Sequence, residues 1–131
     1  MVTGVLIDSH FYIHHLRSGK NPFHALAAAG ENWELFTCGM VMLQVLRGVR
    51  DPRQLVQIEA AFSLMNFIPT SHPVWTKARQ LAWQLDRRGI ILPAQDHLIA
   101  ACALQTKIAV LTADAHFRRV PGLTVLERLS P

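Results

Sequence analysis

The chain has 131 residues, half of them hydrophobic, and a formal net charge of +4 at neutral pH. A chain of this length can bury a core without disulfide or metal cross-links, so we expect a single domain over residues 1–131. No apolar run approaches the roughly 18 residues of a membrane-spanning helix, and the first residues show no signal-peptide pattern, so we expect a cytoplasmic protein without a membrane segment.

The spacing of apolar residues predicts short strands that alternate with helices. In chain order we expect a strand at residues 5–7, helices at 11–17 and 21–30, a strand at 35–37, helices at 40–47 and 51–65, a strand at 67–68, helices at 71–88 and 93–104, and strands at 108–112 and 124–126. This alternation predicts an α/β fold in which helices cover both faces of a central, mostly parallel sheet.

Residues that favour helix ends support several of these boundaries. Ser9 is expected to cap the first helix, and Asn21 followed by Pro22 is the favoured order at the start of the second. Gly89 is expected to end the long amphipathic helix that precedes it. The two cysteines, Cys38 and Cys102, lie in apolar segments, so we expect them to be reduced and to pack in the core.

Three of the five aspartates fall where an α/β fold brings residues to one edge of its sheet. Asp8 ends the first predicted strand, Asp114 follows the strand at 108–112, and Asp96 lies in the first turn of the helix before that strand. Ligands bind beyond the carboxyl ends of parallel strands, so we expect these side chains to converge. Each aspartate alone has an ordinary explanation as a cap or a turn residue. Clustered carboxylates, however, need a cation, and an all-oxygen site selects Mg²⁺ or Mn²⁺ rather than zinc.

Other kinds of site find less support in the sequence. His10 and His14 have a spacing that can bind zinc on one helix face, but no further ligand completes such a site. Neither a Gly-x-Ser-x-Gly nucleophile motif nor a phosphate-binding P-loop is present. The three tryptophans, Trp33, Trp75 and Trp83, are expected in the core or at an interface rather than as platforms for bases.

Four segments resemble, in order and spacing, the signature segments of PIN domains. They are LIDS at residues 6–9, VMLQVLRG at 41–48, DHLIAA at 96–101 and LTADAHF at 111–117. The match covers nearly the whole chain and looks like that of VapC toxins, the toxic members of bacterial toxin–antitoxin pairs. This resemblance implies a PIN-like three-layer domain, with helices on both sides of a central parallel sheet.

The resemblance also implies an activity and a site. Proteins of this kind cleave RNA with an Asp, Glu, Asp, Asp cluster that holds one or two Mg²⁺ ions. Carried over, the cluster is Asp8, Gln44, Asp96 and Asp114, with the three aspartates as metal ligands. Gln44 departs from the pattern, because glutamine keeps the shape of glutamate but loses its charge and its capacity to act as a base. A weakened enzyme, an inactive relative and a deliberate Glu-to-Gln change all remain open as explanations.

Four neighbours of these positions are candidates for supporting roles. Ser9 and Thr112 could orient the carboxylates beside them, although they are equally typical of a helix cap and a strand end. Arg47 could contact RNA phosphates or pair with an acid, or simply lie at a solvated helix end. His116 could touch the substrate or tune a carboxylate, or serve as an ordinary turn residue.

The sequence therefore predicts a magnesium-dependent endoribonuclease toxin, with Mn²⁺ as an alternative ion. The competing hypothesis is a PIN-like module that binds RNA or an antitoxin peptide without cutting, and Gln44 is the feature that divides the two. The resemblance implies further partners: a cognate antitoxin, which could bind a groove around Leu46 and Leu55, and a second copy of the chain in a homodimer.

Overall fold

The computed structural model describes residues 3–29 and 31–129. Its helices and strands, in chain order, are β1 (Thr3–Ile7), α1 (Ser9–Arg17), α2 (Pro22–Ala27), β2 (Trp33–Cys38), α3 (Gly39–Leu46), α4 (Pro52–Phe62), β3 (Asn66–Ile68), α5 (His72–Arg87), α6 (Ala94–Thr106), β4 (Ala109–Leu111), the short 3₁₀ helix η1 (Ala115–Arg119) and β5 (Val125–Leu126). The predicted alternation of strands and helices is confirmed.

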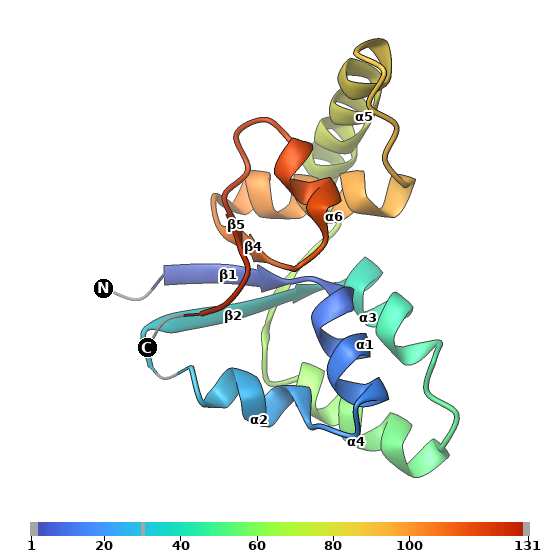
Figure 1. The fold of residues 1–131 in the computed structure, drawn as a ribbon, viewed down its shortest axis with the longest axis vertical. Helices are drawn as coiled ribbons and strands as arrows, with labels where there is room; N and C mark the ends of the chain where they lie inside the picture. The colour runs from blue at the N-terminus through green and yellow to red at the C-terminus, as the bar shows by residue number, and fades with distance from the viewer. Residues whose placement is uncertain (1–2, 30, 130–131) are drawn as a thin grey trace.

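The strands form one five-stranded sheet in the order β3-β2-β1-β4-β5, and every pairing is parallel. The central strand β1 pairs with β2 and β4 and is covered by helices on both faces of the sheet (Figure 1), which explains why Val5, Leu6 and Ile7 form an unbroken apolar run. Gly4 in β1 has no room for a side chain: a Cβ at this position would lie 2.6 Å from a methyl carbon of Ile108.

The order of the strands divides the helices into two layers. From β1 the chain moves outward to β2 and β3, and then returns across the sheet to β4 and β5. Right-handed crossovers in opposite directions place their helices on opposite faces. Accordingly, α1, α2 and α4 lie on one side of the sheet and α5 and α6 on the other (Figure 1). The three-layer α/β architecture expected from the sequence is therefore correct.

Burial follows the predicted amphipathic patterns. The face of α5 that packs on the rest of the domain carries the four residues expected there, namely Val74, Ala78, Leu81 and Leu85. Helix α6 is buried along most of its length, from Asp96 to Ala103, because it lies between α5 and the sheet. Cys38 and Cys102 are both buried and free, as expected. None of the helices in the described ranges combines the length and apolar character needed to cross a membrane.

Several helix ends differ from the sequence-based expectation. Ser9 does not cap α1: it is the first helical residue, and Asp8 holds the cap position without a side-chain capping bond. Helix α4 ends at Phe62 rather than near residue 65, because Asn66 already pairs with β2 and the chain needs the intervening residues to turn. Helix α2 ends at Ala27, and Gly30, where we expected its end, lies outside the described residues.

The exposed apolar side chains bear on two further expectations. Trp75 and Trp83 are 50% and 62% exposed, so they lie outside the core, and their expected place at an interface stays a prediction. Leu46 packs partly against the core, and the groove that borders α3 is lined by Leu43 and Arg47 but not by Leu46 or Leu55, so the antitoxin groove expected around those two leucines stays a prediction.

Candidate metal centre

The sheet brings Asp8 and the segment that carries Asp114 to the ends of two adjacent strands. Ile7 at the end of β1 pairs with Leu111 at the end of β4. Asp8 follows the first and Thr112 the second, and the backbone N–H of Asp8 donates to the carbonyl of Leu111 at 3.0 Å. This is the point where the strand order reverses direction, and such crevices are the usual ligand sites of open parallel sheets.

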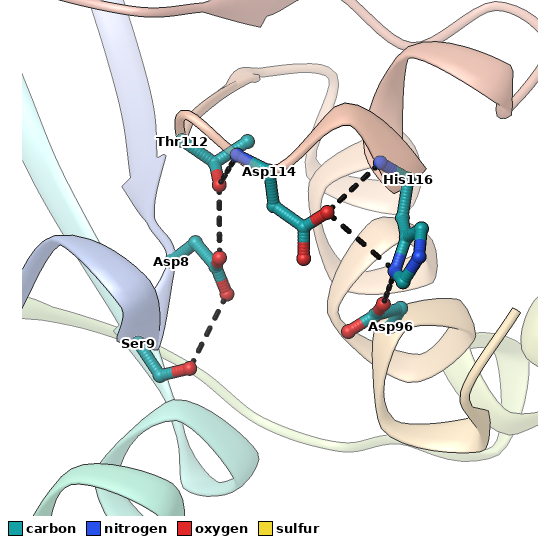
Figure 2. Close-up of polar contacts among 6 residues, drawn as sticks. All are labelled: Asp8, Ser9, Asp96, Thr112, Asp114 and His116. Atoms are coloured by element: carbon teal, nitrogen blue, oxygen red, sulfur yellow. Dashed lines mark hydrogen bonds and ion pairs between the residues drawn. The ribbon is translucent and has the colours of Figure 1, made fainter. Parts of the chain in front are cut away.

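Thr112 connects Asp8 to the segment that carries Asp114. Its hydroxyl donates to Oδ2 of Asp8 at 2.9 Å and accepts from the backbone N–H of Asp114 at 3.0 Å. Ser9 lies on the other side of Asp8, with its hydroxyl 3.5 Å from Oδ1 (Figure 2). Asp8 is only 3% exposed and Thr112 only 2%. The carboxylate of Asp8 is therefore held in a fixed orientation by buried hydroxyl contacts.

Asp96 reaches the same crevice from α6. Its position in the first turn of that helix is as predicted, and its Oδ2 lies 3.1 Å from Nδ1 of His116. The same ring nitrogen lies 3.5 Å from Oδ1 of Asp114, which also accepts the backbone N–H of His116 at 2.9 Å. The imidazole of His116 thus lies between the two carboxylates (Figure 2).

Asp96, Asp114 and His116 each offer one potential ligand atom, and these atoms all lie within 4.8 Å of one another. Asp8 is not part of this mutually close group, although its charge and that of Asp96 repel each other. Asp96 and Asp114 are thus the pair best placed to share a cation, Asp8 is linked to Asp114 through Thr112, and the role of the three aspartates as one metal site stays a prediction.

Burial and mutual repulsion make this cluster unfavourable when it is fully charged. Loss of hydration raises the pKa of Asp8 above its ordinary value, and repulsion from Asp96 adds to the rise, while the Thr112 hydroxyl opposes it. Loss of hydration also raises the pKa of Asp96, and repulsion from Asp114 adds to it, while His116 opposes it. A cation placed among these carboxylates would relieve both effects.

Gln44 borders a groove that is also lined by α6, the helix that carries Asp96. Gln44 lies on α3, and its Oε1 is buried with no hydrogen-bond partner among the described residues. It lines a groove of about 610 Å³ between α3, α5 and α6, together with Arg47 and His97. No hydrogen bond links Gln44 to Asp8, Asp96 or Asp114 within the described ranges, so its place in the site stays a prediction.

Arg47 and His97 complete the surroundings of Gln44. Arg47 is exposed and forms no ion pair with any residue that the structure describes, so it is free to meet an anion. His97 is only 3% exposed, and neither of its ring nitrogens has a hydrogen-bond partner in the described part of the chain. His97 directly follows Asp96 on α6.

The side-chain chemistry of the crevice fits a divalent ion. Carboxylate oxygens from Asp96 and Asp114 face one another, Asp8 lies close by, and no lysine or arginine among the described residues forms an ion pair with any of them. Oxygen ligands of this kind suit Mg²⁺ and Mn²⁺. The separate roles assigned to Ser9, Arg47, Thr112 and His116 stay predictions at this point.

Solved structures with the same fold include bacterial toxin–antitoxin complexes. VapBC2 of Rickettsia felis, bound to a DNA fragment from its promoter, aligns with a TM-score of 0.81 at 17% identity, over 95% of this chain and 98% of that one. DNA-bound VapBC of Salmonella typhimurium aligns with a TM-score of 0.80 at 16% identity, over 96% and 98% of the two chains.

A more distant similarity links the chain to the PIN-domain endonuclease Utp24, with a TM-score of 0.53 at 19% identity, over 94% of this chain and 83% of that one. No curated protein matches by sequence. The family profile of the PIN domain, however, matches residues 5–123. That span includes every acidic residue of the crevice and most of the fold, so the protein belongs to the PIN-domain family.

Proposed function

We propose that the chain is a metal-dependent endoribonuclease and the toxin of a toxin–antitoxin pair. The observation that carries this proposal is the convergence of Asp8, Asp96 and Asp114 at the point where the strand order reverses, in a chain of the PIN-domain family. PIN domains are nucleases, and one structural neighbour is titled a PIN-domain endonuclease. RNA is the substrate that the resemblance of the four sequence segments implies.

Mg²⁺ or Mn²⁺ is the proposed cofactor, and Asp8, Asp96 and Asp114 are the residues proposed to hold it. Such an ion acidifies and orients a water molecule and offsets negative charge that develops on the phosphate. The chain itself contributes orientation: Thr112 holds the Asp8 carboxylate through its buried hydroxyl, and the backbone of η1 holds that of Asp114. Arg47, exposed and unpaired in the described structure, is placed to bind a backbone phosphate.

Gln44 determines how active this chain is. In place of the glutamate that the resemblance implies, a neutral amide removes about one unit of negative charge from the neighbourhood of the ion, so metal affinity should be weaker. The Oε1 of Gln44 is buried and has no hydrogen-bond partner among the described residues, so it is free to accept a hydrogen bond from a bound molecule. The same observation favours the second candidate, a PIN-like module that binds RNA or a peptide without cutting it.

The proposed partners are an antitoxin and a second copy of the chain. Several structural neighbours are titled as toxin–antitoxin complexes, which supports a cognate antitoxin. Three large apolar side chains, Leu43, Trp75 and Ile91, line the α3–α5–α6 groove and are each at least half exposed, which supports a protein partner on that face. A nuclease that acts on cellular RNA is proposed to work in the cytoplasm.

Cleavage of a circular RNA tests the proposal, because it requires an internal cut. With millimolar Mg²⁺, Gln44→Glu should cut faster than the chain as given, and Asp114→Asn in that background should abolish cutting. Gln95→Glu is the matched control: Gln95 lines the same groove, so this change adds the same charge nearby and should not raise the rate.

If Gln44→Glu binds no metal and leaves the circle intact, the nuclease proposal fails and the binding module replaces it. If the chain as given already cuts at the rate of Gln44→Glu, then Gln44 is not the fourth position of the site.

A further inference from the structure

We propose that His116 is a metal ligand through Nδ1, and that this nitrogen makes the site prefer a transition ion such as Mn²⁺ over Mg²⁺. The inference rests on the metal site in the proposed function and names which ion that site selects. It differs from an all-carboxylate site, which is what the resemblance of the sequence segments implies.

The first argument is the geometry of the donor atoms. The Nδ1 atom of His116 lies 3.1 Å from Oδ2 of Asp96 and 3.5 Å from Oδ1 of Asp114. Adjacent ligands of an octahedral ion with bonds of about 2.1 Å lie roughly 3 Å apart. Two of the three separations are close to this spacing, and the candidate ligand atoms of Asp96, Asp114 and His116 all lie within 4.8 Å of one another, so a shift of these side chains toward a common ion would place them on one face of it.

The second argument is that the chain holds His116 in this place. The carboxylate of Asp114 accepts the backbone N–H of His116, which starts the 3₁₀ helix η1. The next residue, Phe117, is fully buried and anchors η1 in the core. Because Asp114 and Phe117 hold the backbone on either side of it, the imidazole is directed toward Asp96 although about half of its side chain stays exposed (Figure 2).

The third argument concerns what the other candidate ligands offer. One oxygen of Asp8 is occupied by the Thr112 hydroxyl, and Asp8 lies outside the mutually close group of ligand atoms. Gln44 brings no charge. An imidazole with its one proton on Nε2 leaves the lone pair of Nδ1 free for the ion, and it supplies this ligand without adding another negative charge to a cluster in which carboxylates already repel one another.

The choice of ion follows from this donor set. Mg²⁺ favours oxygen ligands in near-ideal octahedral geometry, whereas imidazole nitrogen suits first-row transition ions. Mn²⁺ accepts carboxylate oxygens as well, so a site of two or three carboxylates and one imidazole matches it better than it matches Mg²⁺.

Pulsed EPR of Mn²⁺ bound to the metal-stripped protein tests the inference without any measurement of activity. We expect a ¹⁴N coupling from a directly bound nitrogen, which changes when the protein is labelled with ¹⁵N-histidine. His116→Gln should remove this coupling and lower the ratio of Mn²⁺ to Mg²⁺ affinity, measured by calorimetry, at least tenfold. His24→Gln is the control, because His24 is an exposed histidine on α2, on the other side of the sheet from α6, and should change neither value.

His116→Asp provides a second variant that returns an oxygen ligand. It should bind metal without the nitrogen coupling and should favour Mg²⁺ more than the parent chain does. Mn²⁺ binding without any nitrogen coupling overturns the inference but leaves the proposed metal site standing. A coupling that persists in His116→Gln also overturns it, because another histidine would then be the ligand. If neither ion binds, both the inference and the proposed function fail.

Discussion

Replacing Thr112 by valine isolates the contact that orients Asp8. Valine keeps the size and branching of threonine but removes the hydroxyl, so Oδ2 of Asp8 loses a donor and the N–H of Asp114 loses its acceptor. Leaving a buried polar group without its partner costs about 1–3 kcal/mol. Since Asp8 is buried but Asp114 is partly exposed, we expect a total loss of about 2–3 kcal/mol in the free energy of unfolding.

Thr37 offers a control of the same residue type and burial. It is 1% exposed, and its hydroxyl has no hydrogen-bond partner among the described residues. Thr37→Val removes a buried hydroxyl that forms no hydrogen bond with the described residues, so the change should leave the free energy of unfolding the same or raise it slightly. Urea unfolding of both variants with a chelator present gives the comparison. Equal losses in the two variants would refute the role assigned to the Thr112 hydroxyl.

Three further predictions concern packing, charge and assembly. Gly4→Ala should lower the free energy of unfolding by about 1–3 kcal/mol, measured with urea, because the added Cβ would collide with Ile108. Gly39→Ala should not be destabilising, because a Cβ at that position would have no neighbouring atom within 4 Å. Asp8→Asn should stabilise the metal-free protein, and increasingly so as the pH rises above about 4. The raised pKa of Asp8 means that its charged form is unfavourable in the fold, so the parent chain loses stability as Asp8 ionises. Thermal melts with a chelator measure the difference between the two proteins, and a difference that is independent of pH would contradict this. Trp75→Ala should weaken self-association in sedimentation experiments at tens of micromolar, and a parent chain that sediments as a clean monomer would argue against the dimer.

The positions of Asp8, Asp96 and Asp114 could be predicted because they depend on strand and helix ends. An apolar run that stops at an aspartate identifies the carboxyl end of a buried strand, and the parallel order of the strands then brings two such ends together. These inferences need only hydrophobic periodicity and the handedness of crossovers, which are properties of the whole chain.

The orientation of individual side chains could not be predicted in this way. His116 lies between two carboxylates because a 3₁₀ helix follows Asp114, and that helix depends on the anchoring of Phe117 in a core assembled from distant segments. Helix α6 likewise runs past its expected end and stops at Lys107 with φ of 61°, a conformation that usually indicates glycine. Side-chain preferences along the sequence do not contain this information.

The most direct test of the central claim is the effect of divalent ions on thermal unfolding of the metal-stripped protein. An ion that binds only the folded state at 100 times its dissociation constant stabilises it by about 2.7 kcal/mol. If Asp8, Asp96 and Asp114 form a cation site, saturating Mn²⁺ or Mg²⁺ should raise the Tm of the chain by several degrees. The same ions should leave the Tm of Asp96→Asn nearly unchanged. A Tm of the chain as given that neither ion alters, or an equal rise in Asp96→Asn, would contradict the metal site.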